Sequence, residues 1–111
     1  MMAGGRGSRL KRGEKPMVTI FGRRLIEYVA LALEDSSVES IYVATTENVP
    51  LTRAWARDWN LSVVDTPGMG FVPDMISAVK GVEVADPIMV IMADLPLITS
   101  ELIDTIIEVY E

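Results

Sequence analysis

Apolar residues occur along the chain in alternating short runs and spaced stripes, a pattern that predicts a parallel sheet with helices between its strands. Residues 40–45 and 61–65 are rich in the β-branched and aromatic residues typical of strands. Residues 88–93 show no polar alternation, which is how a parallel strand covered on both faces reads. Residues 17–21 form a further short apolar run, closed by Gly22.

The apolar spacing also predicts four amphipathic helices. The first follows Gly22 and is ended by residues 34–37, and the second extends from about Pro50 to about Asp58. The third has Pro73 in its first turn and ends at Gly81, and the fourth is capped by Thr99 or Ser100. We expect their inward stripes to be Leu25, Tyr28, Val29, Ala32 and Leu33; Leu51, Trp55 and Trp59; Met75, Ile76 and Val79; and Leu102, Ile103, Ile106, Ile107 and Tyr110.

This order of elements favours a three-layer α/β sandwich built on a parallel sheet. A chain of 111 residues has the length of one domain, and no linker divides it. No run approaches the roughly 18 apolar residues of a membrane span, and no signal-peptide pattern is visible, so we expect a cytoplasmic protein.

The composition restricts the chemistry that the chain can perform. Without cysteine there is no thiolate nucleophile or disulfide, and without histidine the usual general base is absent. Catalysis would have to depend on Asp, Glu, Lys, Arg, backbone amides and a metal held by oxygen atoms.

Charge is divided unevenly along the sequence. Residues 1–24 hold seven of the ten Lys and Arg with one acid, Glu14, for a net charge of +6, whereas residues 25–111 carry −12. The basic residues of the second part are Arg53, Arg57 and Lys80. An acidic protein with one basic segment is more typical of a discrete anion site than of a binder of nucleic acid or membranes.

That basic segment, residues 3–16, contains four glycines and five Lys or Arg. Glycine lets backbone N–H groups converge on a ligand, and the cations supply positive charge, so the combination suits a polyphosphate. A solvated basic arm or a tag is the alternative interpretation. The Walker pattern is absent, and the third glycine of the dinucleotide fingerprint would fall on Leu10.

The segment resembles the signature of nucleotidyltransferases with a Rossmann-like fold, which reads roughly Ala-Gly-Gly-x-Gly-Ser/Thr-Arg and then Lys-Pro. Residues 3–9 and Lys15-Pro16 match it. The whole chain is most similar to the archaeal adenosylcobinamide-phosphate guanylyltransferases and next to the molybdenum-cofactor guanylyltransferases. Residues 21–29, 42–45, 64–71 and 93–95 carry this further likeness.

The resemblance implies transfer of GMP from GTP to adenosylcobinamide phosphate with release of pyrophosphate. Molybdopterin guanylyl transfer and sugar-phosphate nucleotidyl transfer are alternatives within the class, and a non-catalytic nucleotide-binding module is an alternative outside it. It further implies that residues 1–111 are the nucleotide-binding portion of one nucleotidyltransferase domain, incomplete because most of the first strand and the second half are missing. We therefore expect weak GTP binding, no transfer by this chain, and possible homodimerisation.

Polar residues follow the predicted strands, and in parallel sheets ligands bind at that edge. Within the family signature, the amides from Gly4 to Ser8 would hold the β- and γ-phosphates, while Arg9 and Lys15 would neutralise the α-phosphate and the leaving group. The residues of this phosphate loop are Ala3, Gly4, Gly5, Arg6, Gly7 and Ser8. Asp94 is the candidate ligand for Mg²⁺, although an Asp in a turn is an ordinary alternative.

Three residues are candidates for reading guanine, whose N1–H and N2–H₂ donors suit a carboxylate acceptor. They are Asp65 and Glu47, with Thr45 nearby. A turn at a strand end would equally explain Asp65, and a favourable charge at a helix N-terminus would equally explain Glu47.

Overall fold

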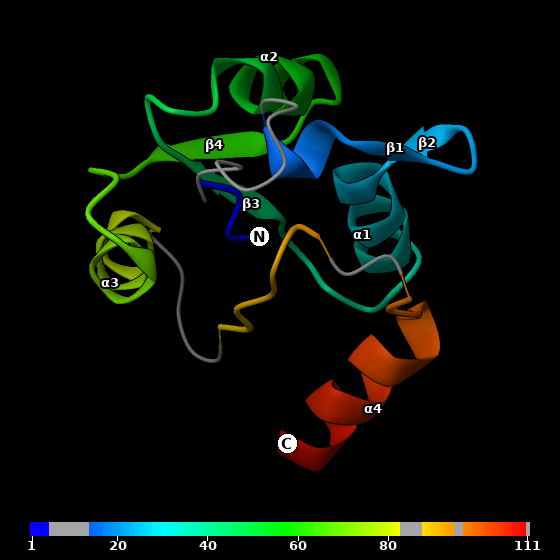
Figure 1. Cartoon of the computed structure of the whole chain (residues 1–111). Coiled ribbons are helices and arrows are strands. Elements are labelled where there is room, and N and C mark those ends of the chain that lie inside the picture. Colours follow the sequence, from blue (N-terminus) through cyan, green and yellow to red (C-terminus); the bar gives the residue numbers. More distant parts are fainter. Residues whose placement is uncertain (5–13, 83–87, 95–96, 111) are drawn as a thin grey trace.

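The computed structural model describes residues 1–4, 14–82, 88–94 and 97–110, and Figure 1 shows their arrangement. Helices and a small parallel sheet are combined, as the alternating pattern predicts. The elements in chain order are the 3₁₀ helix η1 (Lys15–Met17), strands β1 (Thr19–Ile20) and β2 (Arg23–Arg24), helix α1 (Leu25–Glu34), strand β3 (Tyr42–Thr45), helix α2 (Pro50–Asp58), strand β4 (Ser62–Asp65), and helices α3 (Phe71–Gly81) and α4 (Ser100–Tyr110).

Strands β3 and β4 pair in parallel, with Tyr42 opposite Ser62 and Thr45 opposite Asp65. Met2 forms parallel bridges to Ala44 on one side and to Met92 on the other. The first residues of the chain therefore lie between β3 and the segment 91–93, although the sequence pattern leaves too few apolar residues there to predict a strand. This position fixes the start of the glycine-rich segment to the centre of the parallel arrangement.

The predicted strand over residues 88–93 is only partly formed. Met2 N–H donates to the Ile91 carbonyl at 2.8 Å, and Ala93 N–H donates to the Met2 carbonyl at 3.2 Å. Ile88 and Val90 are 40% and 41% exposed, so the expectation of a strand covered on both faces is wrong for this part. Within the described residues, the pairing with Met2 involves residues 91–93, and residues 88–90 lie outside it.

Residues 17–21 also differ from a simple extended run. Met17 ends η1, and β1 pairs antiparallel with β2 through a turn in which Phe21 and Gly22 have positive φ values of 52° and 80°. Positive φ at both turn residues is the geometry of a tight hairpin. The hairpin extends to one side of α1 in Figure 1.

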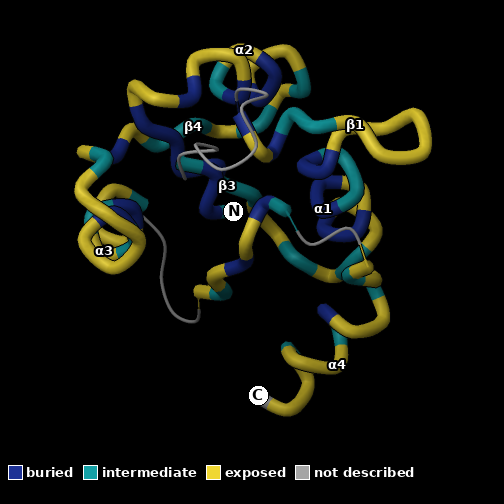
Figure 2. Tube along the Cα trace, viewed as in Figure 1, coloured by how far each residue is buried: buried dark blue, intermediate teal, exposed yellow. Residues whose placement is uncertain are grey.

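The sheet places alternate residues against different helices, as the pleat of a strand requires. Val43 and Ala3 pack with residues of α1 and α2, including Ile26 and Trp55. Met2 and Ala44 pack instead against Ala78 of α3. Figure 2 shows the buried trace concentrated along α1, β3 and the N-terminal residues. The predicted bounds of α2 and the inward position of Trp55 are confirmed, whereas the inward position expected of Leu51 is wrong, because this residue is 63% exposed.

An open, largely apolar groove of about 580 Å³ lies beside the sheet and is lined by residues of α3, α4 and segment 88–91. The predicted inward stripes are accordingly only partly buried. On α3, Ile76 and Val79 are 47% and 39% exposed, and on α4, Ile103 is fully buried while Ile106 is 45% exposed. The sheet is narrow, so parts of α3 and α4 extend beyond its edge and do not cover it.

No helix in the ranges that the structure describes is both long enough and apolar enough to cross a membrane.

Candidate functional site

The parallel register gathers several chain segments at one edge of the sheet. Because Met2 lies opposite both Ala44 and Met92, the continuation of the register brings Gly4 alongside Thr46 and Asp94. Thr66, which follows β4, joins them by donating its hydroxyl to the Thr45 carbonyl at 2.9 Å. The predicted convergence of polar segments at the carboxyl edge is therefore present, and this is where ligands of parallel sheets bind.

Lys15 and Asp94 meet at this edge although the chain separates them widely. The ammonium nitrogen of Lys15 lies 2.8 Å from a carboxylate oxygen of Asp94. The Lys15 side chain is 52% exposed and that of Asp94 is 18% exposed, so the pair is open to a ligand from the lysine side. Lys15 begins the 3₁₀ helix η1, which buried Pro16 anchors.

Gly4 packs directly against Thr46. The Thr46 hydroxyl donates to the Gly4 carbonyl at 3.3 Å and accepts from Asn48 N–H at 3.1 Å. A Cβ at Gly4 would lie 2.5 Å from the Thr46 methyl carbon. Gly4 therefore has a packing role in addition to the ligand approach that its place in the signature predicts.

Glu14 is buried, and its carboxylate accepts hydrogen bonds from two backbone N–H groups of α2, those of Leu51 at 2.8 Å and Thr52 at 2.7 Å. The sequence pattern predicts no function for this residue. The sequence does contain a signal for a distinct role of Glu14, because this residue is the single acid among the first 24 residues and directly precedes the lysine of the signature.

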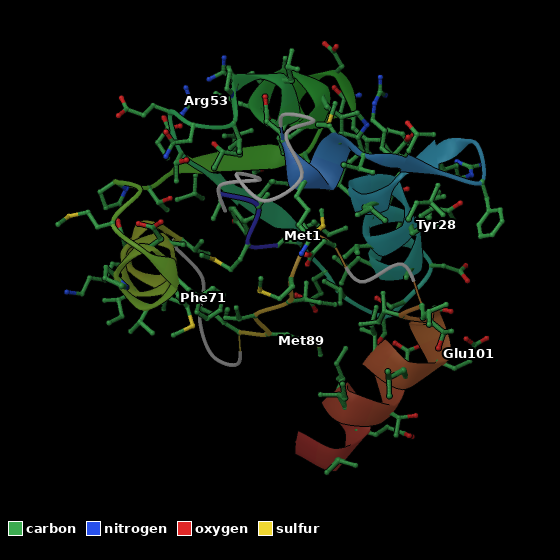
Figure 3. The ribbon with its side chains drawn as sticks, viewed as in Figure 1. Met1, Tyr28, Arg53, Phe71, Met89 and Glu101 are labelled. Atoms are coloured by element: carbon green, nitrogen blue, oxygen red, sulfur yellow. The ribbon has the colours of Figure 1, made fainter. Side chains whose placement is uncertain are left out.

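Two of the candidate base-reading residues are bound by Arg53 of α2, which Figure 3 labels. The guanidinium of Arg53 lies 2.9 Å from the Asp65 carboxylate, and its Nε donates to the Thr45 hydroxyl at 3.3 Å. Thr45 is fully buried, whereas the Asp65 side chain is 68% exposed. Arg53 thus joins the ends of β3 and β4. It is one of three basic residues after position 24, and this scarcity is the sequence signal that could have identified it.

The loop after β4 is shaped by Asp74 from the first turn of α3. Its buried carboxylate accepts N–H bonds from Gly68 at 2.9 Å and Met69 at 3.1 Å. Gly68 and Gly70 have φ values of 77° and 113°, in a region that residues with a Cβ rarely adopt. The sequence pattern places Asp74 at the positive helix end, and the structure shows that it also fixes this loop.

The remaining predicted site residues are placed as follows. Ala3 is buried, and its N–H donates to the Ala44 carbonyl at 2.9 Å. Glu47 is exposed in the turn after Thr46. Gly5, Arg6, Gly7, Ser8 and Arg9 lie outside the described residues. Their assignments, like those of Thr45, Glu47 and Asp65 to the base, stay predictions.

The carboxylate at this edge is compatible with a magnesium ion that is bound mainly through the oxygen atoms of a phosphate ligand. Among residues 1–4, 14–82, 88–94 and 97–110, no group of three or more His, Cys, Asp or Glu could hold a metal by itself. Mg²⁺ usually binds through one or two carboxylates together with waters and phosphate oxygens. Asp94 already has the Lys15 cation beside it, so its carboxylate is in a position where a positive charge is accommodated.

The sequence matches the family described as MobA-like NTP transferase domain over residues 1–111. It is also similar to adenosylcobinamide-phosphate guanylyltransferase from Methanocaldococcus jannaschii, with 34% identity over 115 residues. That alignment covers 99% of this chain and 58% of the relative, so the chain spans less than two thirds of the relative's length. The family match includes every described residue of the candidate site.

Proposed function

Because this chain belongs to the MobA-like NTP transferase domain family, we propose that it is the nucleotide-binding portion of a guanylyltransferase. The reaction is transfer of GMP from GTP to adenosylcobinamide phosphate, a step of cobalamin biosynthesis. The named relative supports this choice of nucleotide and acceptor. In the complete domain, the sheet and its helices would form the three-layer arrangement that the sequence pattern predicts, of the Rossmann-like kind that the family resemblance implies.

The observation that carries the proposal is the Lys15–Asp94 pair at the edge where the glycine-rich segment begins. A mobile cation and a carboxylate at such an edge match the needs of a metal-bound triphosphate. Lys15 would turn from Asp94 to the phosphates when nucleotide binds. Asp94 would then be free to hold Mg²⁺, which when bound neutralises phosphate charge.

In this reaction an oxygen of the acceptor phosphate attacks the α-phosphorus of GTP, and the bond from that phosphorus to the β-phosphate oxygen breaks. Pyrophosphate leaves with the bonding electron pair. The chain would contribute mainly positioning and neutralisation of charge, which requires neither cysteine nor histidine. Amides from Gly4 to Ser8 would hold the β- and γ-phosphates, while Arg9 and Lys15 would stabilise the charge that develops as the bond breaks.

Recognition of guanine is assigned to Glu47, Asp65 and Thr45. The two carboxylates are exposed and offer acceptors for the N–H donors of guanine. Thr45 is buried, so it would act by holding Arg53 in place against Asp65. Homodimerisation and a cytoplasmic location remain parts of the proposal.

Fluorescent GTP and ATP analogues test the nucleotide assignment directly. We expect Mg²⁺-dependent binding with a preference for GTP, and equal binding of both nucleotides would contradict the guanylyl assignment. Pyrophosphate release is then measured with adenosylcobinamide phosphate added or omitted. The proposal assigns no acceptor-binding residue within residues 1–111, so binding without turnover is expected for this chain. Retention of nucleotide by a complete family domain without pyrophosphate release would favour a binding module.

A further inference from the structure

The buried Glu14 carboxylate is the one acidic group of the first 24 residues, and it is not part of the proposed phosphate contacts. It is 8% exposed. Its two oxygens accept from different N–H groups, Oε2 from Leu51 and Oε1 from Thr52. Both partners lie more than 35 residues away in the sequence, so the contact is a tertiary link rather than a local turn.

Helix α2 lacks an N-terminal cap of its own, which explains what Glu14 does there. Its N-cap residue is Val49, which makes no side-chain capping bond, and Pro50 at the first position has no N–H. Leu51 and Thr52 are therefore the first N–H donors without a helical partner. Glu14 supplies both acceptors together with a negative charge, which the positive end of a helix favours.

The same connection between β3 and α2 also holds Gly4. Thr46, at the start of this connection, donates its hydroxyl to the Gly4 carbonyl at 3.3 Å. Gly4 and Glu14 are the described residues that flank residues 5–13 of the basic segment. Both are thus attached to one short stretch of chain, residues 46–52, by side-chain hydrogen bonds.

Lys15 follows Glu14 directly and depends on the same anchor. The Glu14 carbonyl accepts from Met17 N–H at 3.0 Å, so Glu14 also begins the turn of η1 that carries Lys15. The Lys15 side chain is half exposed, and packing alone does not determine where its ammonium group lies. The backbone of Lys15 is held by Glu14, whose two carboxylate oxygens both accept hydrogen bonds.

From these contacts we propose that Glu14 is a positioning residue that fixes Lys15 for triphosphate binding. The proposal rests on the proposed function for the phosphate role of Lys15. Glu14 does not touch the nucleotide in this assignment. It bonds the N-terminus of α2 and thereby holds the turn that presents Lys15 to the sheet edge.

The ligand arm of the test uses inorganic tripolyphosphate and isothermal titration. Glu14→Gln should weaken binding about tenfold, which is the effect of about 1.4 kcal/mol. In a Lys15→Ala background the same substitution should change the affinity less than about twofold, because Glu14 has no lysine side chain left to position. A wild-type affinity for Glu14→Gln, or a full loss repeated in the Lys15→Ala background, would overturn the proposal.

Thr99→Ala is the matched control, because the Thr99 hydroxyl accepts from Leu102 N–H and caps α4 far from the signature segment. It removes one capping hydrogen bond, just as Glu14→Gln removes one of the two acceptors at the N-terminus of α2, and it should leave tripolyphosphate affinity unchanged. An equal loss of affinity in Thr99→Ala would show that general destabilisation is sufficient, and it would overturn the positioning role.

A second arm needs no ligand and so separates this inference from the proposed function. The ¹³Cε and ¹Hε NMR signals of Lys15 should move in Glu14→Gln toward their positions in Asp94→Asn, and should stay in place in Thr99→Ala. Lys15 signals that do not move in Glu14→Gln would refute the positioning role even if tripolyphosphate binds. If the wild-type chain binds no tripolyphosphate, the proposed function fails and this arm still decides the role of Glu14. Should Glu14→Gln not fold, the same criteria apply to Glu14→Asp, which keeps the charge and shortens the reach by one methylene.

Discussion

Gly4→Ala should destabilise the protein through one identifiable contact. The Cβ of an alanine would lie 2.5 Å from the Thr46 methyl carbon, while the Thr46 Cβ and N would both be 3.6 Å away. Carbon atoms in favourable contact are about 3.5–4.0 Å apart, so only the methyl group obstructs the new side chain. The backbone of Gly4 is outside the left-handed region, so the cost is steric rather than conformational.

The surroundings of Thr46 determine the size of this effect. Its side chain is fully buried, and its hydroxyl bonds the Gly4 carbonyl and Asn48 N–H. Rotating the methyl away would break these bonds, and moving Gly4 would disturb the pairing of Ala3 with Ala44. Overpacking a buried site costs about 1–3 kcal/mol, so we expect the free energy of unfolding to fall by about 2 kcal/mol.

Urea denaturation followed by far-ultraviolet circular dichroism measures the effect in a double-mutant cycle. Thr46→Ser removes the obstructing methyl and keeps the hydroxyl, at a cost of about 1 kcal/mol for the lost group. Combined with Gly4→Ala, it should recover about 1–2 kcal/mol relative to the sum of the single effects. Each kcal/mol corresponds to about 4–8 °C in Tm for a domain of 60–100 residues, so thermal melts provide a check.

Additivity of the two substitutions within about 0.5 kcal/mol would refute the steric reasoning, because independent sites add to that accuracy. Gly81→Ala is the matched control. Its Cβ would lie 3.1 Å from a Val64 methyl, so it also crowds a neighbour but shares no contact with Thr46. Combining it with Thr46→Ser should therefore give no recovery.

Three further predictions concern charge. Lys15→Ala should weaken GTP binding by about 1.5–3 kcal/mol, whereas Lys80→Ala, on the exposed end of α3, should cost less than about 1 kcal/mol; equal losses in fluorescence titrations would argue against the assignment. Asp94→Asn should leave the denaturation curve nearly unchanged and remove the Mg²⁺ dependence of GTP binding, so coincident Mg²⁺ titrations with wild type would exclude the metal role. Burial lowers the pKa of the Met1 α-amino group from 8.0 to about 6. The unfolded chain therefore binds more protons between these values, and the free energy of unfolding should rise by about 2 kcal/mol from pH 6 to 8. Acetylation of this amine should flatten that profile, and a slope that persists would assign it to other groups.

Local sequence pattern was sufficient for most of the secondary structure. The bounds of α2, the strands β3 and β4 and the end of α3 at Gly81 agree with the apolar spacing and with the positions of proline and glycine. These signals are local, because a helix or strand repeats within a few residues and its ends depend on adjacent side chains. The family also follows from the signature in residues 3–16, and the match over the whole chain confirms it.

Burial of the outer elements could not be predicted in the same way. The apolar run at residues 88–93 and the stripes of α3 and α4 have the pattern of covered elements, yet several of their residues border the open groove. An apolar stripe shows which side a helix would bury, but the width of the neighbouring sheet decides how much of it is covered. Here the register leaves that sheet narrow.

The sequence by itself therefore determined most of the secondary structure, the family, and the candidate residues Lys15 and Asp94. Only the tertiary structure decided that these two pair, that Glu14 caps a helix 37 residues further on, and that Arg53 holds Asp65. Such contacts join side chains that are distant in the chain, and no periodicity relates them. They depend on the parallel register, which brings the ends of separate strands to one edge and lets buried polar groups find their partners there.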